Sequence, residues 1–479
     1  MPRNLMALCV IPALGLASAA HAAPPVTQQQ MQALMARVAK LEADEAILRK
    51  QAADATASAQ AAQAELARIK GATPGTPAVA TDVAVQSDAG DSDLEAPETA
   101  TAATTPDASA GTDALEATDA SSAGANANGF NPAISVILNG SYSHHSLNPD
   151  DYVRSGFPGG AGPGAQGISL GESEVSLASN IDDKLYGQLT LTAASEGGQD
   201  HIGVEEAYID TTSLPAGFSL RAGRFFSNIG YLNSHHTHTD SFFDRPLAYQ
   251  AFLGNQYGDD GLQLRWVAPT STFLEFGGEA LRGQNYPSGG ASHGGVGVKT
   301  LFAHAGGDVG TDNSWLAGVS VLKSRTESAD DGFTGDETLY LADGTWKWAP
   351  GGNFKDGGVT VRGEYFLEDR DGEFTDPTDS TLTALWNGQR RGGYLEAVYR
   401  LNRTWDIGYR YDKLWSDNSG PVASAFDPWR HSAELTWRNS EFSLVRLQLS
   451  HEKPNDTDTD NALTLQYQVS MGAHGAHKF

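Results

Sequence analysis

The segment Leu463-Thr-Leu-Gln-Tyr-Gln-Val-Ser-Met471 alternates apolar and polar side chains at every position. Successive side chains of a β-strand point to opposite faces, so this segment predicts a strand with one apolar and one polar face. In a soluble β-sandwich the apolar face would pack into a core. In a barrel that crosses a bilayer the apolar face would contact lipid, and the polar face would line a wet interior.

The same period of two recurs in about sixteen segments of the length that a barrel needs to cross a bilayer. Short turns such as Asp182-Asp-Lys184 alternate with longer connections rich in Gly, Asp and Pro, such as 145–167, 369–391 and 416–428. The predicted strands are 133–142, 169–180, 186–194, 204–212, 218–226, 261–268, 273–281, 297–305, 315–323, 338–348, 358–367, 393–401, 405–414, 431–437, 443–450 and 463–471.

Aromatic residues favour the membrane-spanning interpretation. Trp405 and Trp437 adjoin short turns, and Trp415 and Trp429 adjoin a long connection, as in the two aromatic girdles of outer-membrane barrels. Short turns on the inside and long loops on the outside are the outer-membrane arrangement as well, and an even strand count returns the chain to the periplasm. We therefore predict an all-β transmembrane barrel of about sixteen antiparallel strands over residues 130–479, embedded in the lipid of the bacterial outer membrane.

Three segments precede the predicted barrel. Residues 1–22 have a basic start, an apolar middle and a small-residue cleavage site, which predicts a secretory signal peptide. Residues 26–70 carry a heptad of mostly apolar positions and predict an α-helical coiled coil in the periplasm, although one amphipathic helix packed on another surface would give a similar pattern. Residues 71–129 are rich in Ala, Thr, Ser, Asp, Pro and Gly, which predicts a disordered acidic linker.

Composition excludes several classes of function. The chain has 59 acidic residues against 32 lysines and arginines, which disfavours binding to nucleic acid. The single cysteine, Cys9, lies in the predicted signal peptide, so we expect no disulfide and no thiolate metal site in the mature chain. No run of eighteen apolar residues exists, so we expect no transmembrane helix.

One connection, residues 228–260, interrupts the strand pattern with a long insertion. It contains Asn233-Ser-His-His-Thr-His-Thr-Asp240 and Phe242-Phe-Asp-Arg-Pro246. Compact domains rarely carry so long a connection without a use for it. In the predicted topology this connection is the third outer loop, and we expect it to fold into the barrel and narrow the channel.

Residues in and beside this insertion resemble a known family of porins. Gly223-Arg-Phe225, Gly230 and Asp240-Ser-Phe-Phe-Asp-Arg245 are similar to the motif at this place in the phosphate-selective and related substrate-specific porins. Members are trimeric sixteen-stranded barrels, and some carry an N-terminal periplasmic coiled coil. The resemblance implies a homotrimeric channel. The insertion lacks the lysine and arginine excess that an anion site would need, so the solute and the ion preference stay open.

The candidate solute-facing residues come from the insertion and from the strands beside it. Pore selectivity arises from charged side chains at a narrow point, so charged residues and histidines are the expected lining. They are His236, His238, Asp240, Asp244, Arg245, Arg221 and Arg265. Imidazole and carboxylate groups also suit zinc, so a second hypothesis is a metal site. Its ligands would be His235, His236, His238 and Asp240.

The sequence therefore predicts a non-enzymatic porin-type channel for passive diffusion of small hydrophilic solutes or ions, without a cofactor. The alternatives are a zinc-handling barrel that uses the histidine-rich segment and an uptake protein resembling TonB-dependent receptors. An outer-membrane enzyme ranks last, because no nucleophile, base and orienting acid can be grouped from the sequence. The chain ends in Phe479, which resembles the terminal aromatic residue read by the barrel assembly machinery.

Overall fold

The computed structural model describes residues 132–158, 161–196, 199–287, 295–326, 332–376, 379–417 and 420–472. The predicted signal peptide, coiled coil and linker lie outside the described residues, as does Phe479. No described helix is both long and apolar enough to cross a membrane.

The described residues form 17 strands in one sheet. The strands are β1 (Ala133–His145), β2 (Gly167–Leu170), β3 (Ser173–Asn180), β4 (Leu185–Glu196), β5 (Gln199–Thr211), β6 (Phe218–Phe226), β7 (Gly258–Val267), β8 (Phe273–Leu281), β9 (Val298–Val309), β10 (Asn313–Thr326), β11 (Phe333–Trp348), β12 (Gly358–Thr375), β13 (Thr383–Arg400), β14 (Trp405–Trp415), β15 (Trp429–Ser440), β16 (Ser443–Lys453) and β17 (Asp460–Gly472). Short helices interrupt the connections: η2 (Pro149–Asp151), η3 (Pro215–Gly217), η4 (Leu232–Ser234), η5 (Thr237–Thr239), α2 (Leu247–Leu253) and η6 (Pro350–Gly352).

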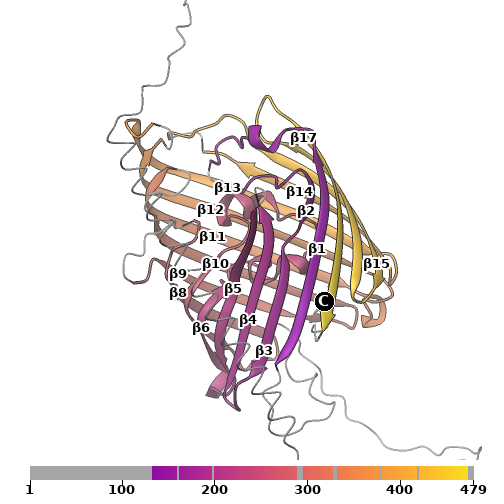
Figure 1. Cartoon of the computed structure of the whole chain (residues 1–479). Coiled ribbons are helices and arrows are strands. Elements are labelled where there is room, and N and C mark those ends of the chain that lie inside the picture. The colour runs from indigo at the N-terminus through magenta and orange to yellow at the C-terminus, as the bar shows by residue number, and fades with distance from the viewer. Residues whose placement is uncertain are drawn as a thin grey trace, which may run out of the picture. The chain divides into compact units, whose positions relative to one another are not determined.

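The sheet closes on itself. Each strand from β3 onward pairs antiparallel with the next, and β17 pairs with β1 in a register that joins Ser135 to Gly472 and His145 to Ala462. β2 and β3 pair with successive parts of β1, so the 17 strands fill 16 positions around the barrel. Figure 1 shows these strands side by side around the barrel. The predicted all-β antiparallel barrel is confirmed, and each of the sixteen predicted segments overlaps an observed strand, with 169–180 divided between β2 and β3.

The break between β2 and β3 was not predicted. Leu170 of β2 lies opposite Gly140, and Glu174 of β3 lies opposite Ile137. Three residues therefore separate Leu170 from Glu174, whereas only two separate Ile137 from Gly140 on β1. The extra residue cannot join the ladder, which is how a bulge divides a strand. The side chain of Asn139 fills the space beside Gly171, where a Cβ atom would lie 2.8 Å from it.

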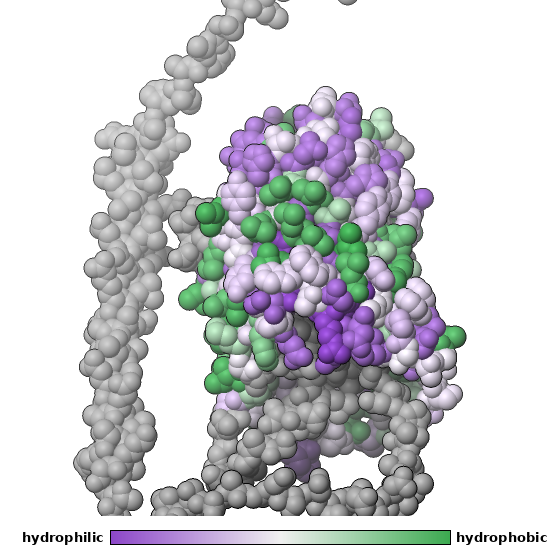
Figure 2. Space-filling view, turned by 90° about the vertical axis from the view of Figure 1, so that its right-hand side faces the viewer, coloured by the Kyte–Doolittle hydropathy of each residue, from purple (hydrophilic) through white to green (hydrophobic). Residues whose placement is uncertain are grey.

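The two faces of the strands differ as the alternation requires. On β17, Leu465 and Tyr467 are about half exposed on the outside, whereas Gln466 and Gln468 are buried inside. Figure 2 shows hydrophobic residues gathered across the middle of one face, with hydrophilic residues above and below them. Trp405 lies opposite Trp437 on the outside, near the short turns, with ring centroids 6.4 Å apart. This apolar outer band with polar residues inside is the pattern of a membrane barrel rather than of a sandwich.

The connection predicted over residues 369–391 is wrong in extent. β12 continues to Thr375 and β13 begins at Thr383, so most of the stretch is a long hairpin. The charged residues that resemble a loop in the sequence pair inside the barrel: Arg370 with Glu337 at 3.0 Å, and Arg390 with Glu368 at 2.6 Å. Buried ion pairs across strands allow a polar sequence to remain in a sheet.

We predict that an arginine at an outward position will destabilise the barrel while an inward position tolerates polar residues. Leu465→Arg should lower the free energy of unfolding in lipid vesicles by about 2–4 kcal/mol, because the cation would face the hydrocarbon. Leu465→Met is the matched control and should change little. Equal stability of the Arg and Met variants, measured by denaturant titration, would place this face away from lipid.

Candidate functional site

The connection between β6 and β7, residues 227–257, is the most elaborate of the described connections. Gly230 adopts a φ of +66°, which only glycine adopts readily, and this turns the chain after β6. η4 and η5 follow, and α2 begins after Pro246 and ends at Gly254 in the left-handed conformation. All seven residues of α2 are buried. We call residues 227–257 the β6–β7 segment.

Asn233 closes the base of this segment. Its amide nitrogen donates to the carbonyl oxygens of Ser227 at 2.7 Å and Tyr257 at 2.8 Å. Its side-chain oxygen accepts from the backbone N–H of Tyr257 at 2.7 Å. Asn233 is fully buried, so these bonds satisfy polar groups that would otherwise be unpaired inside the protein. They hold the two ends of the segment together beside β6 and β7.

The segment is bonded to inward-facing side chains on all sides of the ring. These partners are Glu174 on β3, Glu206 on β5, Glu279 on β8, Ser320 on β10, Glu364 on β12, Asp412 on β14, Arg430 on β15, Arg446 and Gln448 on β16, and Gln468 on β17. Apolar side chains of the segment pack with those of the wall in one buried cluster, which includes Phe252, Leu253 and Phe366. These contacts join the segment to strands all around the ring.

Glu364 is one of the most connected of these wall residues. Its carboxylate accepts from the backbone N–H groups of Tyr231 at 3.0 Å and Leu232 at 3.1 Å. It also accepts from the hydroxyl groups of Tyr249 at 2.9 Å and Tyr394 at 2.8 Å. Four donors on one buried carboxylate satisfy its charge without a cation, so Glu364 positions the turn at Tyr231 and Leu232 and the helix α2.

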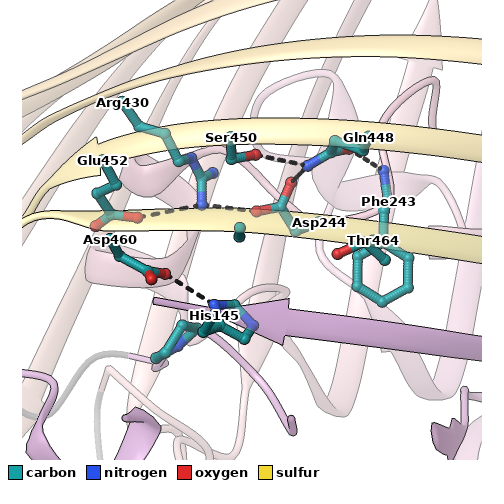
Figure 3. A pocket seen from close by; sticks show the side chains of 11 residues that line it. His145, Phe243, Asp244, Arg430, Gln448, Ser450, Glu452, Asp460 and Thr464 are labelled. Atoms are coloured by element: carbon teal, nitrogen blue, oxygen red, sulfur yellow. Dashed lines mark hydrogen bonds and ion pairs between the residues drawn. The ribbon is translucent and has the colours of Figure 1, made fainter. Parts of the chain in front are cut away.

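A pair of arginines, Arg410 and Arg430, holds the segment at Asp244. Asp244 lies between Arg430, at 2.6 Å, and Arg410, at 2.8 Å, and Gln448 donates to it at 2.7 Å. Figure 3 shows Asp244 facing Arg430 and Gln448, with Phe243 beside them. Burial favours the neutral acid, but Arg430, Arg410 and the hydrogen bonds lower the pKa of Asp244 to about 2. The carboxylate therefore remains ionised and anchors the segment to β14, β15 and β16.

A cluster of histidines and glutamates lies where the segment meets β3 and β5. The Nδ1 atom of His238 lies 2.8 Å from Glu174, and the Nδ1 atom of His236 lies 3.1 Å from the other oxygen of Glu174. The same atom of His236 lies 3.3 Å from Glu205, and its Nε2 atom lies 3.1 Å from Glu206. Burial disfavours the charged imidazole, but Glu174, Glu205 and Glu206 raise the pKa of His236 well above its usual value. We call Glu172, Glu174, Glu205, Glu206, His236 and His238 the His–Glu cluster.

The structure brings only some of the candidate residues together. His236 and His238 join the cluster, whereas the ring of His235 stacks on Tyr231 at 4.5 Å and Asp240 pairs with Arg245 at 2.6 Å. The four candidate metal ligands therefore do not converge. The physical reason is local: η4 and η5 break the extended alternation that would have put the side chains on shared faces.

Arg221 and Arg265 lie on the wall and do not contact the histidines in the described bonds. Arg221 makes a bidentate pair with Asp210, at 3.0 Å and 2.8 Å. Arg265 lies 3.7 Å from Asp210 and 3.9 Å from Glu275. Both arginines are buried, and carboxylates of neighbouring strands match both charges, as burial of a charge requires.

Sequence reasoning missed the glutamates that contact the segment. Glu174 lies on β3, Glu205 and Glu206 lie on β5, and Glu364 lies on β12, so all four lie outside the β6–β7 segment. A signal exists in the strand period: on a barrel strand with one lipid-facing side, a glutamate must point inward. That signal identifies inward acids but not which of them meet the β6–β7 segment.

Comparison with known proteins gives few relatives. No family model matches the sequence. A protein of Aquifex aeolicus (strain VF5), named only as uncharacterized, is 29% identical over 396 residues, which are 73% of this chain and 80% of the relative. Membership of the phosphate-selective porins therefore stays a prediction.

Solved barrels match this chain with TM-scores below 0.5 and low sequence identity. An anion-selective porin from Comamonas acidovorans has a TM-score of 0.48 and 11% identity, over 71% of this chain and 99% of that chain. The outer membrane channel DcaP of Acinetobacter baumannii has a TM-score of 0.47 and 11% identity, over 71% and 97%. OmpF of Salmonella typhi, in complex with daunomycin, has a TM-score of 0.47 and 13% identity, over 70% and 97%. The proposals below rest on the contacts within this chain.

We predict that Glu364→Gln will loosen the β6–β7 segment. A neutral amide offers one acceptor oxygen, and its NH₂ group would face donors, so buried N–H and O–H groups would lose their partner. The variant should lose about 2–4 kcal/mol of stability, and the amides of Tyr231 and Leu232 should exchange hydrogen faster. Glu373→Gln, at an exposed position of the same strand, is the control. Unchanged exchange at both amides would contradict this role of Glu364.

Proposed function

We propose that this chain forms an outer-membrane channel for diffusion of small hydrophilic solutes or ions, with the β6–β7 segment as its narrowest part. The observation that carries the proposal is the attachment of the segment to wall strands on opposite sides of a closed barrel. A segment tied to opposite walls reduces the cross-section, so it would select solutes by size.

The distribution of charge supports selection by charge as well. On one side, Arg410, Arg430 and Arg446 follow one another on β14, β15 and β16. On the other side lies the His–Glu cluster of β3, β5 and the segment. The arginines are matched by Asp244 and Asp412, whereas the described ion pairs of the cluster carboxylates are with histidines, so the cluster side would favour cations. His236, His238, Asp240, Asp244, Arg245, Arg221 and Arg265 are the proposed residues of this narrow region.

We predict that shortening the segment will widen the channel. Excision of residues 234–244 removes Asp244 and both histidines of the cluster, so single-channel conductance in a planar bilayer should rise roughly twofold or more and ion selectivity should weaken. Shortening the β14–β15 connection by residues 420–425 is the control and should change conductance less. Unchanged conductance after the first excision would show that the segment does not limit the current.

The proposed assembly is a homotrimer held in part by the coiled coil of residues 26–70. The support is the heptad pattern and the trimeric habit of the family that the sequence resembles. Deleting residues 28–70 should yield barrels that insert but dissociate more readily in detergent, measured by native mass spectrometry. Deleting 72–114, an equally long part of the linker, is the control. Monomers of the full-length protein under the same conditions would exclude the trimer.

A further inference from the structure

We propose that Glu174, His236, His238 and Glu205 bind one divalent transition-metal ion of the zinc type. The inference goes beyond the proposed channel, because a metal site on the inner wall needs no solute flow. It replaces the ligand set suggested by the histidine-rich sequence: His235 and Asp240 are engaged elsewhere, and two glutamates from the wall take their places.

Neighbouring pairs of the donor atoms already lie near the spacing that zinc requires. Bonds of about 2.1 Å in a tetrahedron place neighbouring ligand atoms about 3.4 Å apart. Ligand atoms of Glu174, His236 and His238 all lie within 4.8 Å of one another. Individual separations are 2.8 Å for His238 to Glu174, 3.1 Å for His236 to Glu174, and 3.3 Å for His236 to Glu205. Small side-chain rotations would bring these atoms to one ion.

A β-bulge supplies the fourth donor. Thr190 pairs with Glu206 and Leu191 pairs with Val204, so Glu205 has no partner in the ladder. The bulge lets two consecutive residues, Glu205 and Glu206, direct their carboxylates toward His236, where a regular strand would send one of them to the lipid face. Bulges of this kind are frequent beside functional sites because they redirect a side chain.

Glu206 has the position of a supporting residue rather than a ligand. It contacts the Nε2 atom of His236, which leaves the Nδ1 atom of that ring toward Glu174 and Glu205. Metal-binding histidines usually give their second ring nitrogen to a carboxylate, which fixes the orientation of the ring. Glu206 is itself held by Gln188 and by the backbone N–H of Phe226. Glu206 would therefore orient the ring of His236, while the Nδ1 atom of that ring faces the other proposed ligands, Glu174 and Glu205.

Two atoms at the centre of the cluster have no hydrogen bond. The Nδ1 atom of His236 and one carboxylate oxygen of Glu205 are buried and face each other without hydrogen-bond geometry. These atoms are held as an ion pair, and a metal ion bound between them would be a shared partner for both. Within the described part of the chain, no lysine or arginine forms an ion pair with Glu172, Glu174, Glu205 or Glu206. A divalent cation would match this excess of negative charge.

The ligand types identify the class of metal. Two imidazoles with two carboxylates suit zinc and similar divalent ions, whereas calcium and magnesium prefer oxygen ligands throughout. Glu172 lies with Glu174 and Glu205 in a second, overlapping set of carboxylates, so a fifth oxygen ligand is within reach. Thr237 donates to Glu172 at 3.0 Å and ties that carboxylate to the segment.

The test is zinc calorimetry on the full-length protein in detergent after treatment with a chelator. Histidines elsewhere in the chain could bind zinc weakly, so the comparison between variants decides the result. His238→Ala and Glu174→Gln should each weaken the tightest zinc site roughly tenfold or more. His235→Ala and His145→Ala should leave that site unchanged, since neither side chain belongs to the cluster. Cobalt absorption in the visible range gives a second readout of imidazole ligation.

Each outcome is decisive for the site. Equal zinc affinity in the wild type, His238→Ala and Glu174→Gln would overturn the proposal and leave the cluster as an ion-pair network that orders the segment. Because Glu174→Gln could disturb folding, Glu205→Gln is a milder variant, and circular dichroism should show native strand content for each protein. Binding needs no ionic current, so loss of the zinc site and absence of conductance are separate results.

Discussion

Closure of the sheet between β1 and β17 is the constraint on which the rest of the structure depends. A strand edge inside a bilayer would expose N–H and C=O groups that no water could satisfy, at a cost of several kcal/mol for each group. The pairing of residues 135–145 with 462–472 removes that edge. Once the ring is closed, the strand alternation sends every second side chain inward. The polar residues of the strands then have one another and the β6–β7 segment as partners.

The inward charges are arranged so that burial does not isolate them. Arg410 meets Asp244 and Asp412, and Arg400 meets Asp406 in a bidentate pair at 2.8 Å and 3.1 Å. Removing either partner of such a pair leaves a buried charge, which costs more than the pair contributes. The segment is therefore part of the charge balance of the wall, and it is held by polar contacts in addition to its apolar cluster.

The sequence was sufficient for the strands but not for the contacts between them. A period of two survives along each strand because lipid contacts one face at all sixteen positions, and this explains why every predicted strand is present. The expectation that a polar, charged stretch is a loop fails at 369–391. Arg370 and Arg390 are charged because they form ion pairs inside the barrel, and the chain stays in the sheet there. Composition drew attention to His236 and His238. Their partner Glu174 lies more than sixty residues earlier and is brought near by barrel closure.

The two sides of the segment differ in how their charges are matched, and this difference has a physical consequence. Arg410 and Arg430 are opposed by Asp244 and Asp412 at fixed positions, so that side carries little unmatched charge. In the His–Glu cluster the carboxylates are opposed by imidazoles, which are weaker and exchangeable partners of carboxylates. In the proposed channel, a cation would therefore be drawn to the cluster rather than to the arginine side. The arginine side holds the segment in place, and the cluster is the part of the site whose charge can respond to what binds there.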